Sequence, residues 1–88
     1  MNRLLFTPSA WDDYLYWQNQ DKKTLKRINM LIQSIMRTPF EGEGKPEELR
    51  GELAGKWSRR IDSQNRIVYL VKDESVTILQ CRTHYKEH

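Results

Sequence analysis

The sequence predicts an α+β fold in which a two-helix hairpin packs on one face of a small antiparallel sheet. Three observations favour this fold. Apolar residues recur with helical spacing between residues 8 and 37, three short apolar runs follow one another between residues 57 and 82, and links of hairpin length separate those runs. With 88 residues, of which 38% are hydrophobic and 31% charged, the chain is expected to form a single domain over residues 1–88.

The first expected elements are a strand and a helix. Residues 3–6, "RLLF", are the strand. Thr7 is a helix cap, and Pro8 suits the first helical position, where no amide hydrogen is needed. This helix is expected to end by Gln20, because Asp21 has the character of a new cap. Its expected apolar stripe consists of Trp11, Tyr14, Leu15 and Gln18.

The second helix is expected over residues 22–37, and the tight link between the helices predicts an antiparallel hairpin. Its apolar face consists of Leu25, Ile28, Leu31, Ile32, Ile35 and Met36. Pro39 ends the helix, because a residue before proline disfavours helical backbone. The stretch 38–56, "TPFEGEGKPEELRGELAGK", is rich in glycine and proline and predicts a long loop with one helical turn over residues 46–49.

Three strands complete the expected sheet, over residues 57–62, 66–71 and 76–82. If Lys72 pairs with Val76, strict alternation assigns the side chains to two faces. The face toward the helices then holds Trp57, Ile61, Ile67, Tyr69, Val71, Thr77, Leu79 and Cys81. The open face holds Ser58, Arg60, Asp62, Arg66, Val68, Leu70, Ile78, Gln80 and Arg82, with His84 next in line. Arg59 falls on the helix-facing side, which is unfavourable unless its guanidinium reaches solvent.

Composition narrows the class of protein. The net charge of +3 and pI of about 9.2 are mildly basic and do not by themselves indicate a partner. No run approaches the length of a membrane span and no export signal is evident, so we expect no membrane association and a cytoplasmic location. The lone Cys81 fits a reducing compartment. One cysteine and two histidines show no zinc-site spacing, so no metal and no cofactor are expected.

Basic side chains gather on the expected open face. Arg60, Arg66 and Arg82 lie there with His84, and arginine forks match the oxygens of a phosphate. The residues alone are equally compatible with a solvated face that carries incidental charges.

A site that cleaves RNA through the 2′-hydroxyl also needs a base to remove that proton. Glu47 and Glu48, in the long loop, are the candidates. Acids that follow a proline, here Pro46, also commonly decorate the first turn of a helix, so the pattern alone does not decide between the two interpretations.

Five segments resemble the YoeB toxins of the RelE-type superfamily, and the similarity covers almost the whole chain. They are "WDDYLYWQ" at 11–18, "RTPFEGEGKPEEL" at 37–49, "WSRRI" at 57–61, "RIVYLV" at 66–71 and "CRTHY" at 81–85. The resemblance implies the compact fold of the small microbial ribonucleases. It also implies a ribosome-dependent endonuclease that cleaves messenger RNA in the A site and is held inactive by a YefM-like antitoxin.

The resemblance also implies roles for individual residues. Glu47 matches the general base, Arg66 the phosphate-stabilising arginine, His84 the general acid, and Tyr85 the tyrosine that orients or stacks on the scissile nucleotide. Arg60 and Arg50 match supporting basic residues of the family, and Arg82 joins this expected set from its place on the open face.

The sequence departs from the family pattern at two places. Glu48 stands where the family often has proline, and residues 86–88 continue past the tyrosine at which family members often stop.

Two other functions are compatible with the fold. One is a toxin of the same fold that binds a topoisomerase and cuts no RNA; the set of Glu47, Arg66 and His84 argues against it. The other is a module that binds nucleic acid without chemistry. A homodimer is also compatible with the sequence.

Overall fold

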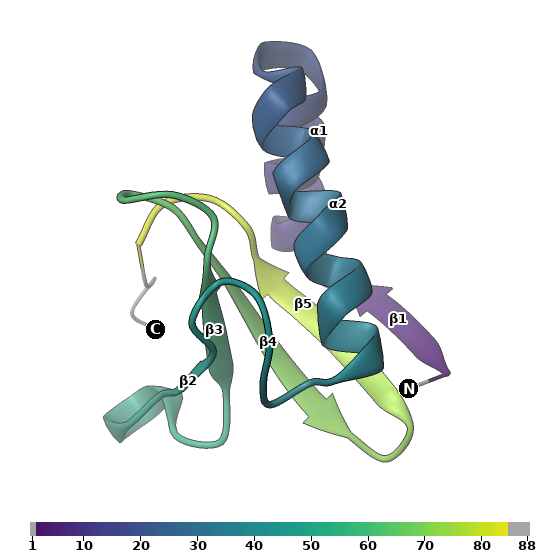
Figure 1. The fold of residues 1–88 in the computed structure, drawn as a ribbon, viewed down its shortest axis with the longest axis vertical. Helices are drawn as coiled ribbons and strands as arrows, with labels where there is room; N and C mark the ends of the chain where they lie inside the picture. The colour runs from purple at the N-terminus through teal and green to yellow at the C-terminus, as the bar shows by residue number, and fades with distance from the viewer. Residues whose placement is uncertain (1, 85–88) are drawn as a thin grey trace.

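The computed structural model describes residues 2–84, in which two helices pack against a five-stranded sheet (Figure 1). In chain order the elements are β1 (Arg3–Phe6), α1 (Pro8–Gln20), α2 (Lys22–Arg37), β2 (Glu47–Glu48), a 3₁₀ turn (Gly51–Leu53), β3 (Trp57–Arg60), β4 (Arg66–Lys72) and β5 (Ser75–Gln80). The strand order across the sheet is β1-β5-β4-β3-β2. The predicted α+β class is confirmed, with the qualification that the sheet is mixed.

The helix ends form where the sequence predicts them. The Thr7 hydroxyl accepts a hydrogen bond from the Ala10 amide at 3.1 Å and caps α1. The Asp21 carboxylate caps α2 by accepting from the Lys23 and Thr24 amides. The Thr24 hydroxyl, these two amides and the Lys23 charge hold the pKa of the Asp21 carboxyl below its ordinary value.

The two helices form the predicted antiparallel hairpin, linked by Asp21 alone. Tyr14, seven residues before the link, donates a hydrogen bond at 2.7 Å to Asn29, eight residues after it. The predicted apolar face of α2 is confirmed. Ile28, Leu31, Ile32 and Ile35 are buried, and Leu25 and Met36 pack against the same core.

The predicted face of α1 is wrong by about one position. Its buried residues are Ala10, Asp13 and Trp17, while Trp11 is 47% exposed. Contacts with Cys81, the residue after β5, orient the helix: the Trp17 indole donates to the Cys81 carbonyl at 2.7 Å, and the Cys81 amide donates to the Asp13 carboxylate at 3.1 Å. Both stripes have helical spacing, so only these tertiary bonds decide which one is buried.

The edge strand β1 makes the sheet mixed rather than antiparallel. It pairs in parallel with β5, from Arg3 opposite Ser75 to Phe6 opposite Ile78, while the other pairs are antiparallel. The chain between these two strands contains both helices and the strands β2, β3 and β4, so it is far longer than the crossover of about a dozen residues that a parallel pair requires.

The register of the last hairpin differs from the prediction by one residue. Lys72 pairs with Ser75, not Val76, because the turn contains only Asp73 and Glu74, and Asp73 adopts a left-handed φ of 48°. Val76 and Ile78 therefore face the helices and are buried, whereas Ile78 was predicted on the open face and Thr77 on the helix side.

A bulge then restores the predicted phase at the end of β5. Tyr69 pairs with Ile78 and Val68 with Gln80, so Leu79 is the extra residue. After this bulge Gln80 shares the open face with Val68, and Cys81 lies against α1, as predicted.

The predicted helical turn over residues 46–49 is also wrong. Glu47 and Glu48 form the two-residue edge strand β2, which pairs with Ser58 and Trp57 of β3. Cross-strand pairing with β3 thus outweighs the local preference for a turn after proline. None of the helices in the described part of the chain is long and apolar enough to cross a membrane.

Candidate active site

The sheet face opposite the helices carries the predicted functional residues of β2, β3 and β4. Residues paired directly across a sheet point to the same side. One such row runs across four strands and consists of Glu47, Ser58, Val68 and Gln80. The next pair toward the loop between β3 and β4 is Arg60 opposite Arg66. We call this side the open face; the predicted placement of Arg60 and Arg66 on it is confirmed.

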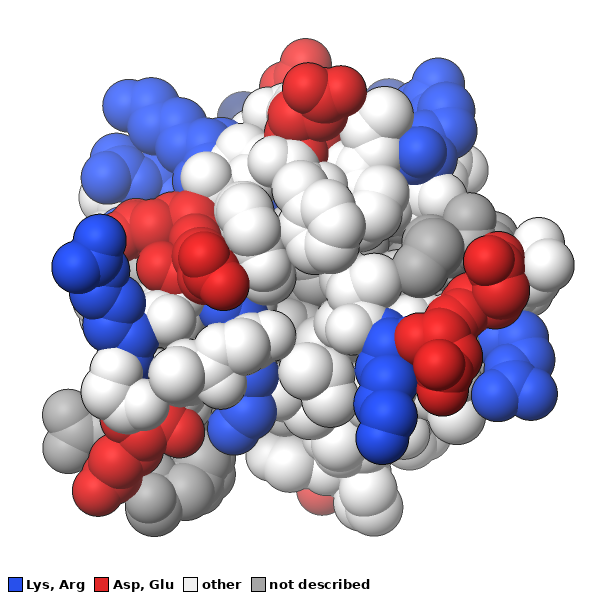
Figure 2. All heavy atoms as spheres, turned by 90° about the horizontal axis from the view of Figure 1, so that it is seen from below, with Lys and Arg blue, Asp and Glu red and all other residues white. Residues whose placement is uncertain are grey.

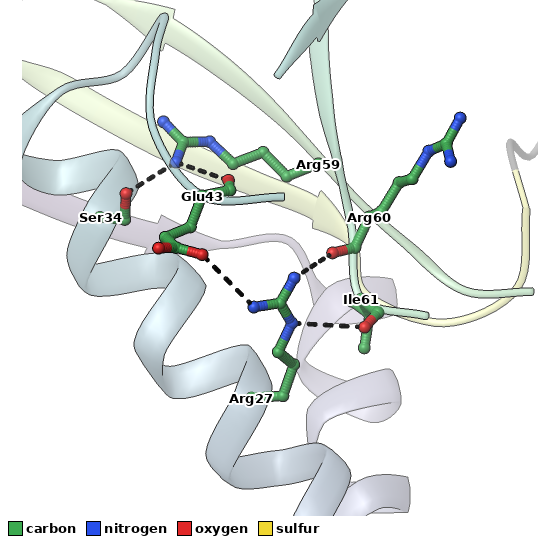
Figure 3. Close-up of polar contacts among 6 residues, drawn as sticks. All are labelled: Arg27, Ser34, Glu43, Arg59, Arg60 and Ile61. Carbon is green, nitrogen blue, oxygen red and sulfur yellow. Dashed lines mark hydrogen bonds and ion pairs between the residues drawn. The ribbon is translucent and has the colours of Figure 1, made fainter. Parts of the chain in front are cut away.

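The two arginines of the open face are held differently. Arg66 is buried, with 8% of its surface exposed, and its Nη1 donates to the carbonyl oxygens of Asp62 at 2.7 Å and Asn65 at 3.1 Å. Arg60 is exposed, and its side chain extends away from the helices in Figure 3. One arginine is therefore fixed in place before any ligand arrives, and the other is available to adjust.

A tight turn between β3 and β4 supports Arg66. The Asp62 carboxylate accepts from the amides of Gln64 and Asn65, both at 2.8 Å, and from the Asn65 side chain at 3.1 Å. Burial alone raises the pKa of the Asp62 carboxyl, but these hydrogen bonds and the nearby Arg66 charge outweigh it, and the pKa lies below its ordinary value. The turn therefore keeps a stable carboxylate beside the arginine.

Residues 81–84, which we call the C-terminal turn, lie next to Arg66. The Arg66 amide donates to the Thr83 carbonyl at 2.9 Å, and the Thr83 amide donates to the Asn65 side-chain oxygen at 2.7 Å. His84 is exposed at the end of this turn. The structure thus brings the backbone that carries His84 to the strand that carries Arg66. Tyr85 and the tail after it lie outside the described residues.

Arg82 does not join the other arginines on the open face. Its guanidinium lies 3.5 Å from the ring centroid of Tyr16, on α1. The alternation that predicted its position ends with β5 at Gln80, so Arg82 is free of the strand geometry and stacks on an aromatic ring instead.

Glu47 and Arg50 lie at the edge of the sheet beyond β3. Glu47 is exposed on β2, and Arg50 is exposed just before the 3₁₀ turn. Glu47 shares the open face with Arg60 and Arg66 by register. Arg50 follows β2 and is not placed on this face by any strand pairing.

A buried arginine on the predicted helix-facing side of β3 holds the loop in front of β2. Arg59 is fully buried and does not reach solvent. Its guanidinium donates five hydrogen bonds of 2.6–3.2 Å, to the Tyr69 hydroxyl, the Ser34 hydroxyl and the carbonyls of Thr38, Glu41 and Glu43. We call residues 38–44 the anchored loop. All five acceptors are neutral, and they match the five donors of the guanidinium. Figure 3 shows two of these bonds, to Ser34 and Glu43.

Neighbouring groups complete this anchor. Tyr69 accepts from Arg59 and donates to the Pro39 carbonyl at 2.6 Å. Burial raises the pKa of the Tyr69 hydroxyl, and the Arg59 charge opposes that rise only in part. The phenol therefore stays protonated and keeps its bond to the loop. The sequence did offer a signal for this anchor. Alternation places Arg59 on the helix-facing side, and the long loop before its strand has backbone carbonyls that need hydrogen-bond donors.

A second contact ties the anchored loop to α2. Arg27 donates to the carbonyls of Arg60 at 3.2 Å and Ile61 at 3.4 Å, and it lies 3.9 Å from the Glu43 carboxylate (Figure 3). A cleft of about 430 Å³ opens beside these groups. It is lined by Arg27, Gly44, Lys45, Arg60, Ile61, Asp62 and Ser63.

On the side of the molecule seen in Figure 2, the charged side chains do not form a single patch. Basic and acidic side chains alternate there around a largely uncharged centre. Within residues 2–84, no group of three or more His, Cys, Asp or Glu side chains is placed to hold a metal ion. By strand register the open face carries the Glu47 carboxylate and the guanidiniums of Arg60 and Arg66, and the backbone just before His84 is bonded to the Arg66 amide.

Comparison with known proteins gives a consistent assignment. The family model of YoeB-like toxins of bacterial type II toxin–antitoxin systems matches residues 6–85. The Toxin YoeB of Escherichia coli (strain K12) is 54% identical over 83 residues, which cover 94% of this chain and 99% of that protein.

Solved structures agree with this match. A YoeB/ParE toxin from Agrobacterium tumefaciens has a TM-score of 0.92 and 48% identity, with 94% of this chain and 99% of that chain covered. Two Staphylococcus aureus structures, a heterotetrameric YoeB–YefM toxin–antitoxin complex and a YoeB dimer, each have a TM-score of 0.87 and 46% identity, with 94% and 97% covered.

Proposed function

This chain belongs to the family of YoeB-like toxins of bacterial type II toxin–antitoxin systems, and we propose that it is an endoribonuclease that cleaves messenger RNA in the ribosomal A site and so inhibits translation. The observation that carries the proposal is the shared open face. Glu47, Arg60 and Arg66 point to it by strand register, and the backbone of the C-terminal turn is bonded to Arg66.

The chemistry proposed is transesterification through the RNA's own 2′-hydroxyl. Glu47 removes the 2′-proton, and the 2′-oxygen attacks the adjacent phosphorus. Arg66 stabilises the negative charge on the phosphorane oxygens, and its two bonds to backbone carbonyls hold it ready for that task. Protonated His84 gives its proton to the departing 5′-oxygen as the bond between phosphorus and that oxygen breaks. The products are a 2′,3′-cyclic phosphate and a free 5′-hydroxyl.

Three further residues are proposed to position the RNA. Exposed Arg60 and Arg50 are proposed to contact phosphates, and Tyr85 to stack on or orient the scissile nucleotide. Arg82 is left out of this phosphate-binding set, because its guanidinium lies on the Tyr16 ring.

Ribosome dependence follows from the small size of the site. The chain has 88 residues and the open face spans only a few strands, which leaves little surface to hold RNA in line. The A site would provide that positioning, an effect that can be worth several orders of magnitude. Rapid cutting of bare RNA at the same positions would contradict this part of the proposal.

The proposed protein partners follow the relatives. A YefM-like antitoxin is proposed to bind and inhibit the chain, and the Staphylococcus aureus YoeB–YefM complex supports this. The Staphylococcus aureus YoeB dimer likewise supports a homodimer. An antitoxin that leaves both Arg66 and the C-terminal turn uncovered would have to inhibit by another route.

The decisive experiment maps cleavage on translated messenger RNA by primer extension, with and without the protein. A 2′-deoxy substitution at the single nucleotide 5′ of the cut should abolish cleavage while ribosome binding persists. The 5′ fragment should end in a 2′,3′-cyclic or 3′-phosphate. Normal cleavage of the deoxy-substituted message would refute the mechanism.

Two further arms of that experiment separate other chemistries. EDTA, at a level that leaves ribosomes intact, should not stop cleavage, because side chains supply the base, the anion-binding group and the acid. Inhibition of supercoiling by gyrase without any RNA cleavage would instead favour the topoisomerase-directed function.

A further inference from the structure

The C-terminal turn is held by two side-chain amides to which the proposed reaction assigns no role. They belong to Gln80, the last residue of β5, and Asn65, the residue before β4. The Gln80 side chain donates to the carbonyl of His84, and the Asn65 side chain accepts from the amide of Thr83, the residue before His84. Their bonds decide how the turn leaves the sheet.

Gln80 gathers three consecutive carbonyls onto one nitrogen. Its side chain is buried on the open face, and Nε2 donates to the carbonyl oxygens of Arg82 at 3.0 Å, Thr83 at 3.4 Å and His84 at 2.7 Å. Three carbonyl dipoles that converge on one point repel one another unless a donor lies between them. The Gln80 amide is that donor, so the curled backbone of the C-terminal turn depends on it.

Thr83 shows that this backbone is under constraint. Its φ is +67°, a left-handed conformation that is a genuine outlier for a β-branched residue. Such conformations persist only where the surroundings impose them. Both backbone groups of Thr83 are used: its amide donates to the Asn65 side chain, and its carbonyl accepts from the Arg66 amide.

The same Asn65 belongs to the turn that holds the Arg66 guanidinium. Its carbonyl and that of Asp62 accept from Arg66 Nη1, while its side-chain nitrogen donates to the Asp62 carboxylate. One short turn therefore contacts the arginine side chain on one side and the C-terminal turn on the other. A shift of Asn65 changes the position of His84 relative to Arg66.

We propose that Gln80 and Asn65 are positioning residues that set His84 against Arg66 for protonation of the leaving 5′-oxygen. This inference rests on the proposed function, in which His84 is the general acid. Neither residue touches the RNA in this view, and both act through His84.

The test measures single-turnover cleavage by Gln80→Met and Asn65→Ala on ribosomes programmed with a defined message. Methionine keeps the length of glutamine and lacks its donor. Each variant should cleave roughly 10- to 100-fold more slowly, the order of loss that follows displacement of a catalytic group by about 1 Å. Binding to the ribosome should be unchanged. Gln64→Ala is the matched control, because Gln64 contributes only its backbone amide to the Asp62 turn among the described contacts, and the rate should stay normal.

Two readouts separate positioning from a merely structural role. On a message with sulfur in place of the scissile 5′-oxygen, the leaving thiolate needs no proton, so the variants should approach the unmodified protein's rate. In a His84→Gln background, Gln80→Met and Asn65→Ala should add almost no further loss, because they act through the missing imidazole. Losses that multiply with that of His84→Gln, or that are equal on both messages, would overturn the inference.

Folding and the proposed function are tested separately. Thermal melting identifies a variant that fails to fold, and Asn65→Ala, at a half-buried turn position, then carries the test in place of buried Gln80. Normal rates in both variants, beside a strong loss in His84→Gln, would refute the positioning inference alone. No loss in His84→Gln itself would refute the general-acid assignment and the positioning inference with it.

Discussion

The anchored loop and the C-terminal turn both bring a chain segment to the open face, and they are held by opposite means. The anchored loop, which leads to Glu47, is fixed from inside by the charged and fully buried Arg59 guanidinium. The C-terminal turn, which carries His84, is fixed by the neutral amides of Gln80 and Asn65 and ends at an exposed residue.

This difference indicates which substitutions should lower the stability of the fold and which should lower the rate of catalysis. A buried cation whose partners are all neutral is expensive to disturb, because its loss leaves several buried acceptors without donors. The exposed end of the C-terminal turn, at Thr83 and His84, is held by neutral amides and can change its geometry while the core remains intact. Changes in the anchored loop should therefore appear first as lost stability, and changes in the C-terminal turn first as lost catalysis.

The largest effect is expected at the end of the C-terminal turn. His84→Gln should reduce the rate of cleavage on the ribosome by about 10²–10⁴, as for the loss of a general acid. Its free energy of unfolding should stay within about 0.5 kcal/mol, because the residue is exposed. Single-turnover kinetics and urea denaturation measure the two quantities. A large loss of stability with a normal rate would invert the comparison.

The anchored loop should respond in stability. Arg59→Met is expected to lower the free energy of unfolding by about 3–5 kcal/mol, because five acceptors lose their donors in a buried site. Arg60→Met is the matched control, because Arg60 directly follows Arg59 and its side chain is exposed. This substitution should change the free energy of unfolding by less than about 0.5 kcal/mol. Equal effects of the two substitutions in urea denaturation would show that the buried guanidinium is not an anchor.

A glycine inside the anchored loop gives a smaller test. Gly42 has a φ of +115°, and a β-carbon there would lie 2.9 Å from the Ser34 hydroxyl and 3.3 Å from Arg59 Nη1. Gly51 also has a positive φ, +67°, but a β-carbon there would meet nothing within 4 Å. Gly51→Ala should lower the free energy of unfolding by about 1 kcal/mol, and Gly42→Ala by about 1–2 kcal/mol more. Identical losses would argue that the packing around Arg59 is loose.

The smallest effect is expected in the pH dependence of stability, through the turn between β3 and β4 that lies beside the C-terminal turn. The pKa of the Asp62 carboxyl is lower in the folded protein, so its ionised form adds stability above the unfolded-state pKa of about 4, and that contribution is lost as the pH falls through the folded-state value. Asp62→Asn should therefore flatten the fall in stability between about pH 5 and pH 3. Unfolding by urea at several pH values measures this, and an unchanged slope would exclude a role for Asp62 in acid sensitivity.

Much of the fold was predictable because its signals are local. Thr7 with Pro8, and Asp21, mark the helix starts through bonds to amides two or three residues away. The apolar face of α2 follows from spacing alone. On the open face, Arg60 and Arg66 keep their predicted side, because the β3–β4 hairpin is short and regular.

The rest of the site depended on contacts between distant residues. A turn one residue shorter than expected shifted the pairing of β5 by one residue, and a bulge at Leu79 shifted it back. Gln80 therefore lies on the predicted face, although strict alternation predicts neither of the two shifts. Arg82 left the open face because β5 ends two residues earlier and an aromatic ring on α1 lies within reach.

The sequence by itself determined both helices, the strands other than β2, and their order, since caps, spacing and residue type act over a few neighbouring positions. Only the tertiary structure decided that α1 buries Ala10, Asp13 and Trp17, that β1 joins β5 in parallel, and that Arg59 is enclosed rather than solvated. The physical reason is that a buried polar group is stable only when every partner is in place. The partners of Arg59 come from α2, the anchored loop and β4, segments that meet only after the chain has folded.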